Sequence, residues 1–146
     1  MVITLQLSSD LKIIPQISRD IIKQIKSKNI SDDDLFDIRL ALEEALVNAI
    51  KHGNKGKPSK KVFLKVLIKA HMVSIQIKDE GEGFDSDELT SPLLTKNLKK
   101  TRGRGIFLIK NLMDKVEFFD GGSGIKMVKL MKQQLFKPKG AEKLRS

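Results

Sequence analysis

The stretch of sequence that decides the fold is residues 31–54, SDDDLFDIRLALEEALVNAIKHGN. Ser31 is a good helix N-cap, and the aspartates that follow it suit the positive end of a helix dipole. Gly53 and Asn54 are typical of a helix end, so the predicted helix runs to about His52. Its apolar residues recur at helical spacing on one face: Leu35, Ile38, Leu42, Ala45, Leu46 and Ala49. A helix with one apolar face has to bury it against another layer of the domain.

The segments around this helix alternate between strand and helix patterns. Strand patterns cover Val2–Leu7, Lys61–Ala70, Val73–Lys78, Lys115–Phe119 and Ile125–Met131, and helix patterns cover about Pro15–Ser27 and Gly105–Met113. Because most strands come in adjacent pairs, we expect an α+β domain. The expected architecture is a two-layer α/β sandwich with a mixed, mostly antiparallel sheet and helices on one face. We assign residues 1–133 to this domain and predict that the basic segment 134–146 is a disordered tail.

The composition limits the protein to few classes. With 146 residues, of which 40% are hydrophobic, the chain has the size of one globular domain. It has no cysteine, which excludes disulfides, thiolate zinc sites and a cysteine nucleophile. No apolar run is long enough to cross a bilayer, and the first residues do not resemble a signal peptide. We therefore expect a cytoplasmic protein that does not act at a membrane.

The charge suggests an anionic partner. The chain carries 28 Lys and Arg against 18 Asp and Glu, a net charge of +10, which suits nucleic acid, a membrane surface or nucleotide phosphates. The basic residues are spread over helices, strands and tail, and neither Tyr nor Trp is present to stack on bases. We expect no direct binding to nucleic acid.

The helix at residues 31–54 carries a polar ridge at the border of its apolar face, made of Glu44, Asn48, Lys51 and His52. A carboxylate and an amide one turn apart can share a metal ion and a reacting oxygen. The alternative is a solvated helix face.

A carboxylate follows the strand Val73–Lys78. Asp79 has the same parity as the core-facing residues of that strand, so its side chain is expected to point inward, where it needs a donor. Gly81 and Gly83 follow at once and allow a ligand to approach the backbone. The alternative is a glycine-rich turn that the Asp79 side chain closes.

A third candidate site lies where Arg102, Gly103, Arg104 and Gly105 lead into an apolar helix. Free N–H groups at a helix start and two arginines suit an anion, although a plain loop-to-helix junction has the same pattern. The chain has no GxxxxGK[ST] sequence, which excludes a P-loop.

Together and in this order, the three patterns resemble the N, G1 and G2 boxes of the GHKL ATPase superfamily, which includes histidine kinases, Hsp90, DNA gyrase B and MutL. Residues 42–53, LEEALVNAIKHG, and 103–114, GRGIFLIKNLMD, look most like its branch of anti-sigma-factor serine/threonine kinases. The resemblance covers about residues 1–133 and implies the Bergerat, or histidine kinase-like ATPase, fold.

The resemblance implies ATP and Mg²⁺ as ligands and assigns roles to the first two boxes. Asn48 would coordinate a Mg²⁺ ion that bridges the triphosphate, and Glu44 would be the general base toward a Ser or Thr hydroxyl or a water. Asp79 would accept the adenine amino group, while Gly81 and Gly83 would let the base and ribose approach.

The resemblance also implies the groups that bind phosphate. Gly103 and Gly105 with their neighbouring amides would hold the phosphates, and Arg102 and Arg104 are equal candidates for the γ-phosphate. Lys51 is either a phosphate contact or a solvated lysine.

Two further points concern the same family pattern. The segment Asp85–Thr101, which includes a possible short helix at Asp85–Leu89, would be the ATP lid. Glu43 stands where many of these kinases carry Ser, but adjacent residues on a helix point in different directions, so Glu44 stays the predicted base.

The resemblance implies an ATP- and Mg²⁺-dependent protein serine/threonine kinase that is an anti-sigma factor in a partner-switching system. It would phosphorylate an anti-sigma-factor antagonist, sequester a sigma factor and form a homodimer. The alternative function is a non-catalytic, ATP-responsive protein-binding module. A histidine kinase is disfavoured because His52 and His71 are the only histidines and no dimerisation helix carries a phosphoacceptor.

Overall fold

The computed structural model of this protein describes residues 1–83 and 102–131. The predicted helix at Asp85–Leu89, the predicted lid Asp85–Thr101 and the predicted tail 134–146 lie outside the described residues. Among the described residues, no helix combines the length and the apolar character needed to span a bilayer.

Five strands form one sheet in the order β1-β2-β3-β5-β4. They are β1 (Val2–Ser8), β2 (Lys61–Ile68), β3 (Met72–Lys78), β4 (Lys115–Phe119) and β5 (Gly124–Leu130). All four strand pairs are antiparallel. The sequence predicted a mixed, mostly antiparallel sheet, and the described strands form a purely antiparallel one. Strand β1 lies at one edge of the sheet and β4 at the other.

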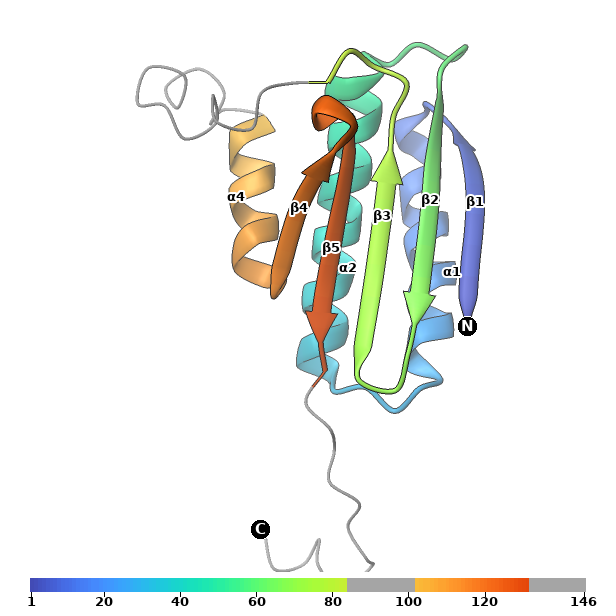
Figure 1. The fold of residues 1–146 in the computed structure, drawn as a ribbon. Coiled ribbons are helices and arrows are strands. Elements are labelled where there is room, and N and C mark those ends of the chain that lie inside the picture. Colours follow the sequence, from blue (N-terminus) through green and yellow to red (C-terminus); the bar gives the residue numbers. More distant parts are fainter. Residues whose placement is uncertain (84–101, 132–146) are drawn as a thin grey trace, which may run out of the picture.

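Three α-helices cover one face of this sheet (Figure 1). They are α1 (Ile14–Lys26), which follows the short 3₁₀ turn η1 (Leu11–Ile13), α2 (Asp32–Val47) and α4 (Arg102–Leu112). Ser31 caps α2 as predicted, because its Oγ accepts a hydrogen bond from the backbone N–H of Asp34 at 3.1 Å. The predicted two-layer α+β architecture is confirmed.

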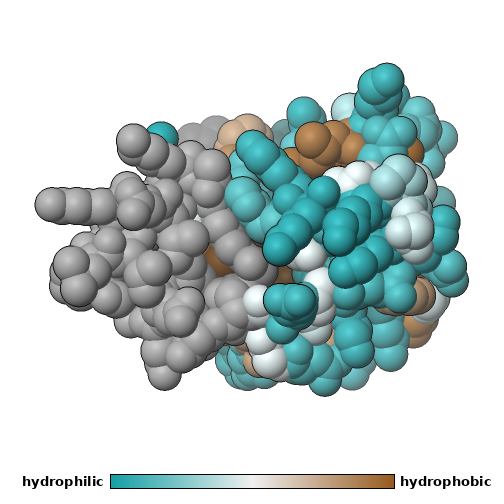
Figure 2. Space-filling view, turned by 90° about the horizontal axis from the view of Figure 1, so that it is seen from above, coloured by the Kyte–Doolittle hydropathy of each residue, from teal (hydrophilic) through white to brown (hydrophobic). Residues whose placement is uncertain are grey.

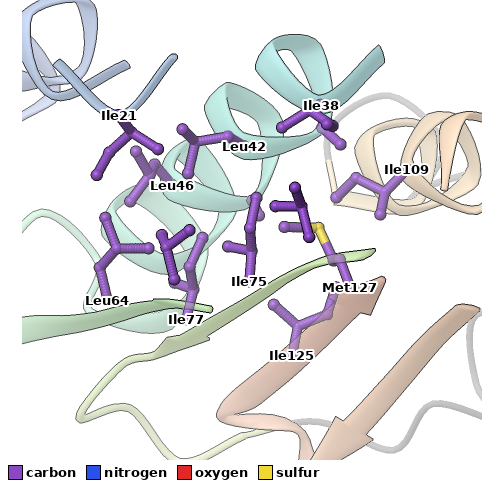
Figure 3. Close-up of a cluster of buried hydrophobic side chains, with 14 of the residues drawn as sticks. Ile21, Ile38, Leu42, Leu46, Leu64, Ile75, Ile77, Ile109, Ile125 and Met127 are labelled. Carbon is purple, nitrogen blue, oxygen red and sulfur yellow. The ribbon is translucent and has the colours of Figure 1, made fainter. Parts of the chain in front are cut away.

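The core fills the space between the two layers (Figure 3). Ile21, Leu42 and Leu46 come from the helices and face Leu64 and Ile75 of the sheet. Burying each such side chain contributes about 1.5–3 kcal/mol. All six apolar residues predicted for the buried face of the helix at residues 31–54 are buried. This packing fixes α2 against the centre of the sheet.

Two helix boundaries differ from the prediction. The last turn of the predicted helix is the π-helical turn η2 (Asn48–Gly53), in which the Asn54 N–H donates to the Ala49 carbonyl five residues earlier at 2.8 Å. Helix α4 begins at Arg102, so Gly103 and Gly105 lie inside its first turn and not before it. First-turn N–H groups have no carbonyl partner within their helix.

Candidate functional site

Four segments meet at one end of the molecule: the end of α2 with η2, the end of β3, the first turn of α4, and the connection between β4 and β5 (Figure 1). A pocket lies between them, here called the central pocket. Its lining residues are Ala45, Asn48, Ala49, Ile77, Asp79, Ile106, Phe118, Gly122, Ser123, Gly124 and Ile125. Of the predicted site residues, Asn48 and Asp79 line this pocket, and both come from the patterns that suggested a ligand.

Asp79 is the buried carboxylate of the central pocket. Its side chain is 4% exposed, as its strand parity predicted. Its backbone N–H donates to the Ser123 carbonyl at 2.9 Å, and its Oδ1 accepts from the Gly81 N–H at 2.8 Å. The carboxylate therefore closes a glycine turn and also lines the pocket, so the two interpretations of this motif are compatible.

Gly53 and Gly81 make room for this carboxylate. A Cβ added to Gly53 would lie 2.1 Å from Asp79 Oδ2, and one added to Gly81 would lie 2.1 Å from the Gly53 carbonyl oxygen. Such distances do not occur in real structures, so both positions require glycine. The end of η2 and the turn after β3 thus touch through backbone atoms.

Gly83 makes the same kind of contact on the other side of the turn. Its φ is +79°, which favours glycine, and a Cβ there would lie 2.2 Å from the Gly121 carbonyl oxygen of the β4–β5 connection. Gly81 therefore lies beside the Asp79 carboxylate, whereas Gly83 lies against the connection between β4 and β5.

Glu44, Asn48 and Gly105 meet where α2 packs against α4. A Cβ added to Gly105 would lie 2.9 Å from Glu44 Oε2 and 3.1 Å from Asn48 Nδ2. Asn48 Nδ2 is buried and has no hydrogen-bond partner among the described residues. A buried amide without a partner is costly, which points to a ligand that supplies the missing bond.

This arrangement fits the ligands that the sequence suggested. Whichever way its amide is turned, Asn48 offers an N–H donor suited to a phosphate oxygen and a carbonyl oxygen suited to Mg²⁺. The described residues contain no group of three or more His, Asp or Glu that could hold a metal ion. This is compatible with Mg²⁺, which takes few protein ligands when phosphates and waters complete its shell.

Glu43 is separated from this group. It forms an ion pair with Arg39 one turn earlier on α2, with 3.7 Å between Arg39 Nε and Glu43 Oε2. Of the two adjacent carboxylates, only Glu44 lies close to Gly105. The geometry supports the choice of Glu44 over Glu43.

Lys51 lies outside the central pocket. It lines a second cleft, here called the lysine cleft, together with Ser9, Asp10, Leu11, Lys12, Ile50, Lys55 and Gly56. The end of the molecule on which α2 terminates is mainly hydrophilic in its described part (Figure 2). A π-helical turn advances by fewer degrees per residue than an α-helix, so the residues after Asn48 are rotated relative to the predicted ridge.

The remaining predicted residues lie in the first turn of α4. Gly103 is half-buried, Gly105 is buried and Arg104 is exposed. Arg102 begins the helix, and its side chain lies outside the described part of the chain.

Sequence reasoning missed several residues of this region. Asn54 was predicted only as part of a helix end, but its side chain is fully buried and makes three hydrogen bonds. Phe118 and Ser123 line the central pocket from the last hairpin. Their strand and turn patterns contain no signal for a site, since only the fold brings them to Asp79.

Known proteins resemble this chain in sequence. The family described as the histidine kinase-like ATPase domain matches residues 7–130. An anti-sigma F factor of Bacillus cytotoxicus is 38% identical over 93 residues, which are 62% of this chain and 64% of that protein. An anti-sigma F factor of Anoxybacillus flavithermus is 33% identical over 102 residues, which are 66% of this chain and 70% of that protein. The chain thus matches slightly less than two thirds of the first relative.

A solved structure has the same fold. It is the crystal structure of the RsbU and RsbW domains of a Mycobacterium tuberculosis protein, with a TM-score of 0.60 and 15% identity. The match covers 94% of this chain and 35% of that one.

Proposed function

This chain belongs to the histidine kinase-like ATPase domain family and, within it, to the anti-sigma-factor branch, and we propose that it is an ATP-dependent protein serine/threonine kinase. In this proposal it is an anti-sigma factor of a partner-switching system. It phosphorylates a small anti-sigma-factor antagonist and, when that antagonist is not available, sequesters a sigma factor. The observation that carries the proposal is that Asp79 and Asn48 line one pocket with largely apolar remaining walls.

The pocket suits adenine better than guanine. For a purine that turns position 6 toward Asp79, the buried carboxylate is an acceptor that can bind the exocyclic amino group of adenine and would repel the oxygen that guanine has at the same position. Ile77 and Ile106 offer apolar surface to a planar base. With the base beside Asp79, the triphosphate extends toward Asn48 and Gly105.

The other end of the pocket holds the phosphates in this proposal. N–H groups of the first turn of α4 and the positive end of its dipole attract phosphate oxygens, and Arg102 or Arg104 adds charge. Asn48 would hold the Mg²⁺ ion through its side-chain oxygen. When bound, the ion neutralises negative charge on the phosphate oxygens.

Glu44 is the general base in this proposal. It accepts the proton of the Ser or Thr hydroxyl as the hydroxyl oxygen attacks the γ-phosphorus, and ADP leaves with the electron pair of the broken P–O bond. Its half-buried carboxylate supports the assignment, because it lies beside Gly105 in the first turn of α4, where this proposal places the phosphates.

The proposed partners follow from the relatives, which are named anti-sigma F factors. We propose a sigma factor and an antagonist with a Ser or Thr phosphoacceptor as protein partners, a second copy of this chain as a homodimer partner, and the cytoplasm as the location. Sedimentation of the purified protein, alone and with a candidate sigma factor, measures these assemblies directly.

Two measurements test the function. Calorimetric titration should show Mg²⁺-dependent ATP binding by the wild type and its loss in Asp79→Asn, while an absence of binding by the wild type rejects the whole proposal. Labelled ATP should transfer phosphate to a candidate antagonist with the wild type but not with Glu44→Gln. If Glu44→Gln leaves partner regulation intact and Asp79→Asn abolishes it, the protein is a non-catalytic, ATP-responsive binding module.

A further inference from the structure

Asn54 joins three distant segments next to the central pocket. Its side chain is 0% exposed. Nδ2 donates to Ser9 Oγ at 2.8 Å, after the end of β1, and to the Lys61 carbonyl at 2.9 Å, at the start of β2. Oδ1 accepts from the Glu80 N–H at 2.8 Å, in the turn that follows β3.

These bonds leave the Asn54 amide one orientation. The backbone N–H of Glu80 can only donate and the carbonyl of Lys61 can only accept, so Oδ1 must face Glu80 and Nδ2 must face Lys61. Both hydrogens of the amide are used within the protein. Asn54 therefore has no donor left for a ligand, and any effect it has on one must pass through other residues.

The residue that Asn54 holds is the neighbour of the base-binding carboxylate. Glu80 lies between Asp79 and Gly81, and the Gly81 N–H donates to Asp79 Oδ1. The backbone just before Asn54 also touches this carboxylate, since Gly53 leaves no room for a Cβ. Asn54 thus fixes the turn on which the position of the Asp79 carboxylate depends.

The same residue is tied to the other end of the pocket. Its backbone N–H closes the π-helical turn η2 by donating to the Ala49 carbonyl at 2.8 Å, and η2 begins at Asn48. The short turn η2 therefore connects Asn48, at the phosphate end of the pocket, with Asn54, which binds the turn after β3. The spacing between the two ends of the pocket is set within these few residues.

We propose that Asn54 is a positioning residue that holds the Asp79 carboxylate in place for adenine and thereby sets the preference of the pocket for adenine over guanine nucleotides. The inference rests on the proposed function, because it takes Asp79 to be the acceptor for the base. The side chain of Asn54 acts on the base end of the pocket alone. The phosphate end, with Asn48 and Gly105, is connected to Asn54 only through its backbone and does not depend on its side chain.

The test measures the dissociation constants of ATP, GTP and inorganic triphosphate, each with Mg²⁺, for the full chain. In Asn54→Ala, the preference for ATP over GTP should fall roughly tenfold, as expected from losing a buried hydrogen bond. The affinity for inorganic triphosphate should stay that of the wild type. A wild-type ratio of ATP to GTP affinity in folded Asn54→Ala overturns the positioning role.

Ser9→Ala is the matched control. It removes a partner of Asn54 Nδ2 and lowers stability, but it leaves the bond from Glu80 to Oδ1 in place. If its ATP to GTP ratio falls as much as that of Asn54→Ala, the effect is a general loss of stability and the proposal is wrong.

Two outcomes remain distinguishable. If the wild type binds no nucleotide, the proposed function fails and this inference fails with it. If the wild type binds ATP and Asp79→Asn does not, while Asn54→Ala behaves as the wild type, only this inference fails. If Asn54→Ala does not fold, hydrogen exchange is measured on the wild type. The Glu80 amide should then exchange as slowly as the amides of the core strands. Fast exchange would contradict the hydrogen bond from Glu80 to Asn54 and overturn the inference.

Discussion

Gly105 lies so close to Glu44 that a Cβ on residue 105 would come within 2.9 Å of Glu44 Oε2. The same Cβ would be 3.1 Å from Asn48 Nδ2. The sequence suggested that this glycine serves a loop-to-helix junction or an anion site. The structure places it inside α4, where the lack of a side chain keeps open the space in front of Glu44 of α2 and Asn48 of η2.

Gly105→Ala should separate stability from function. Alanine favours a helix over glycine by up to about 1 kcal/mol, and the nearest contact is the flexible end of the Glu44 side chain, so the variant should unfold at a similar or higher temperature. Its methyl group occupies the space beside Glu44 and Asn48, so Mg²⁺-ATP affinity and phosphate transfer should fall roughly tenfold. Thermal unfolding and calorimetric titration measure the two effects.

The control for this prediction lies on the same helix. Phe107 is 67% exposed, and Phe107→Ala should leave ATP affinity unchanged. Unchanged ATP affinity and unchanged phosphate transfer in Gly105→Ala would show that the space in front of Glu44 is not used by the nucleotide.

Gly53→Ala should abolish base recognition. The new methyl group would stand 2.1 Å from Asp79 Oδ2, so either the carboxylate or the turn must move. We expect at least a tenfold loss of ATP affinity, measured by titration, because the acceptor for adenine is displaced.

Gly56→Ala is the matched control for Gly53→Ala. Gly56 has a φ of +67°, but a Cβ there meets nothing within 4 Å. The control should lose about 1 kcal/mol of stability through backbone strain and keep its ATP affinity. Equal loss of affinity in both variants would contradict the role given to the Gly53–Asp79 contact.

The elements that could be predicted are those set by local patterns. Strand β4 has the predicted bounds, and the burial of Asp79 followed from its parity in β3. The positions of Lys51 and Asn54 could not be predicted, because no local sequence pattern indicates the π-helical turn that contains Lys51 and ends just before Asn54. The role of Asn54 depends on bonds to residues 45 and 26 positions away, which only the folded sheet brings together.

Ser31→Ala should destabilise the fold without affecting the site. Ser31 Oγ accepts from the Asp34 N–H at the start of α2, far along the helix from Asn48. Loss of an N-cap costs about 1 kcal/mol, which lowers the melting temperature by a few degrees in a domain of this size. Ser27→Ala, which removes an exposed bond to the Gln24 carbonyl, should change the melting temperature by less. An equal or smaller effect at Ser31 would contradict the capping role.

Lys129 is a buried cation on the core-facing side of β5, and its replacement should destabilise the protein. Its Nζ donates to Asp37 Oδ2 of α2 at 2.9 Å and to the Leu112 carbonyl at the end of α4 at 2.7 Å. Lys129→Ala leaves both acceptors without this donor and leaves a gap between the two helices, so we expect a loss of about 2–4 kcal/mol in the free energy of unfolding. Chemical denaturation measures this loss.

Lys129→Met tests whether the charge or the volume matters. Methionine fills much of the same space without the donor, so this variant should recover part of the loss, as replacement of buried polar contacts by apolar ones often does. Lys126→Met, on the same strand but on the opposite face of the sheet, is the control and should change stability by no more than about 0.5 kcal/mol. If Lys129→Ala is as stable as Lys126→Met, the contacts that join β5 to α2 and α4 contribute nothing. The loss of stability should leave ATP affinity intact wherever the protein is folded, because Lys129 does not line the central pocket.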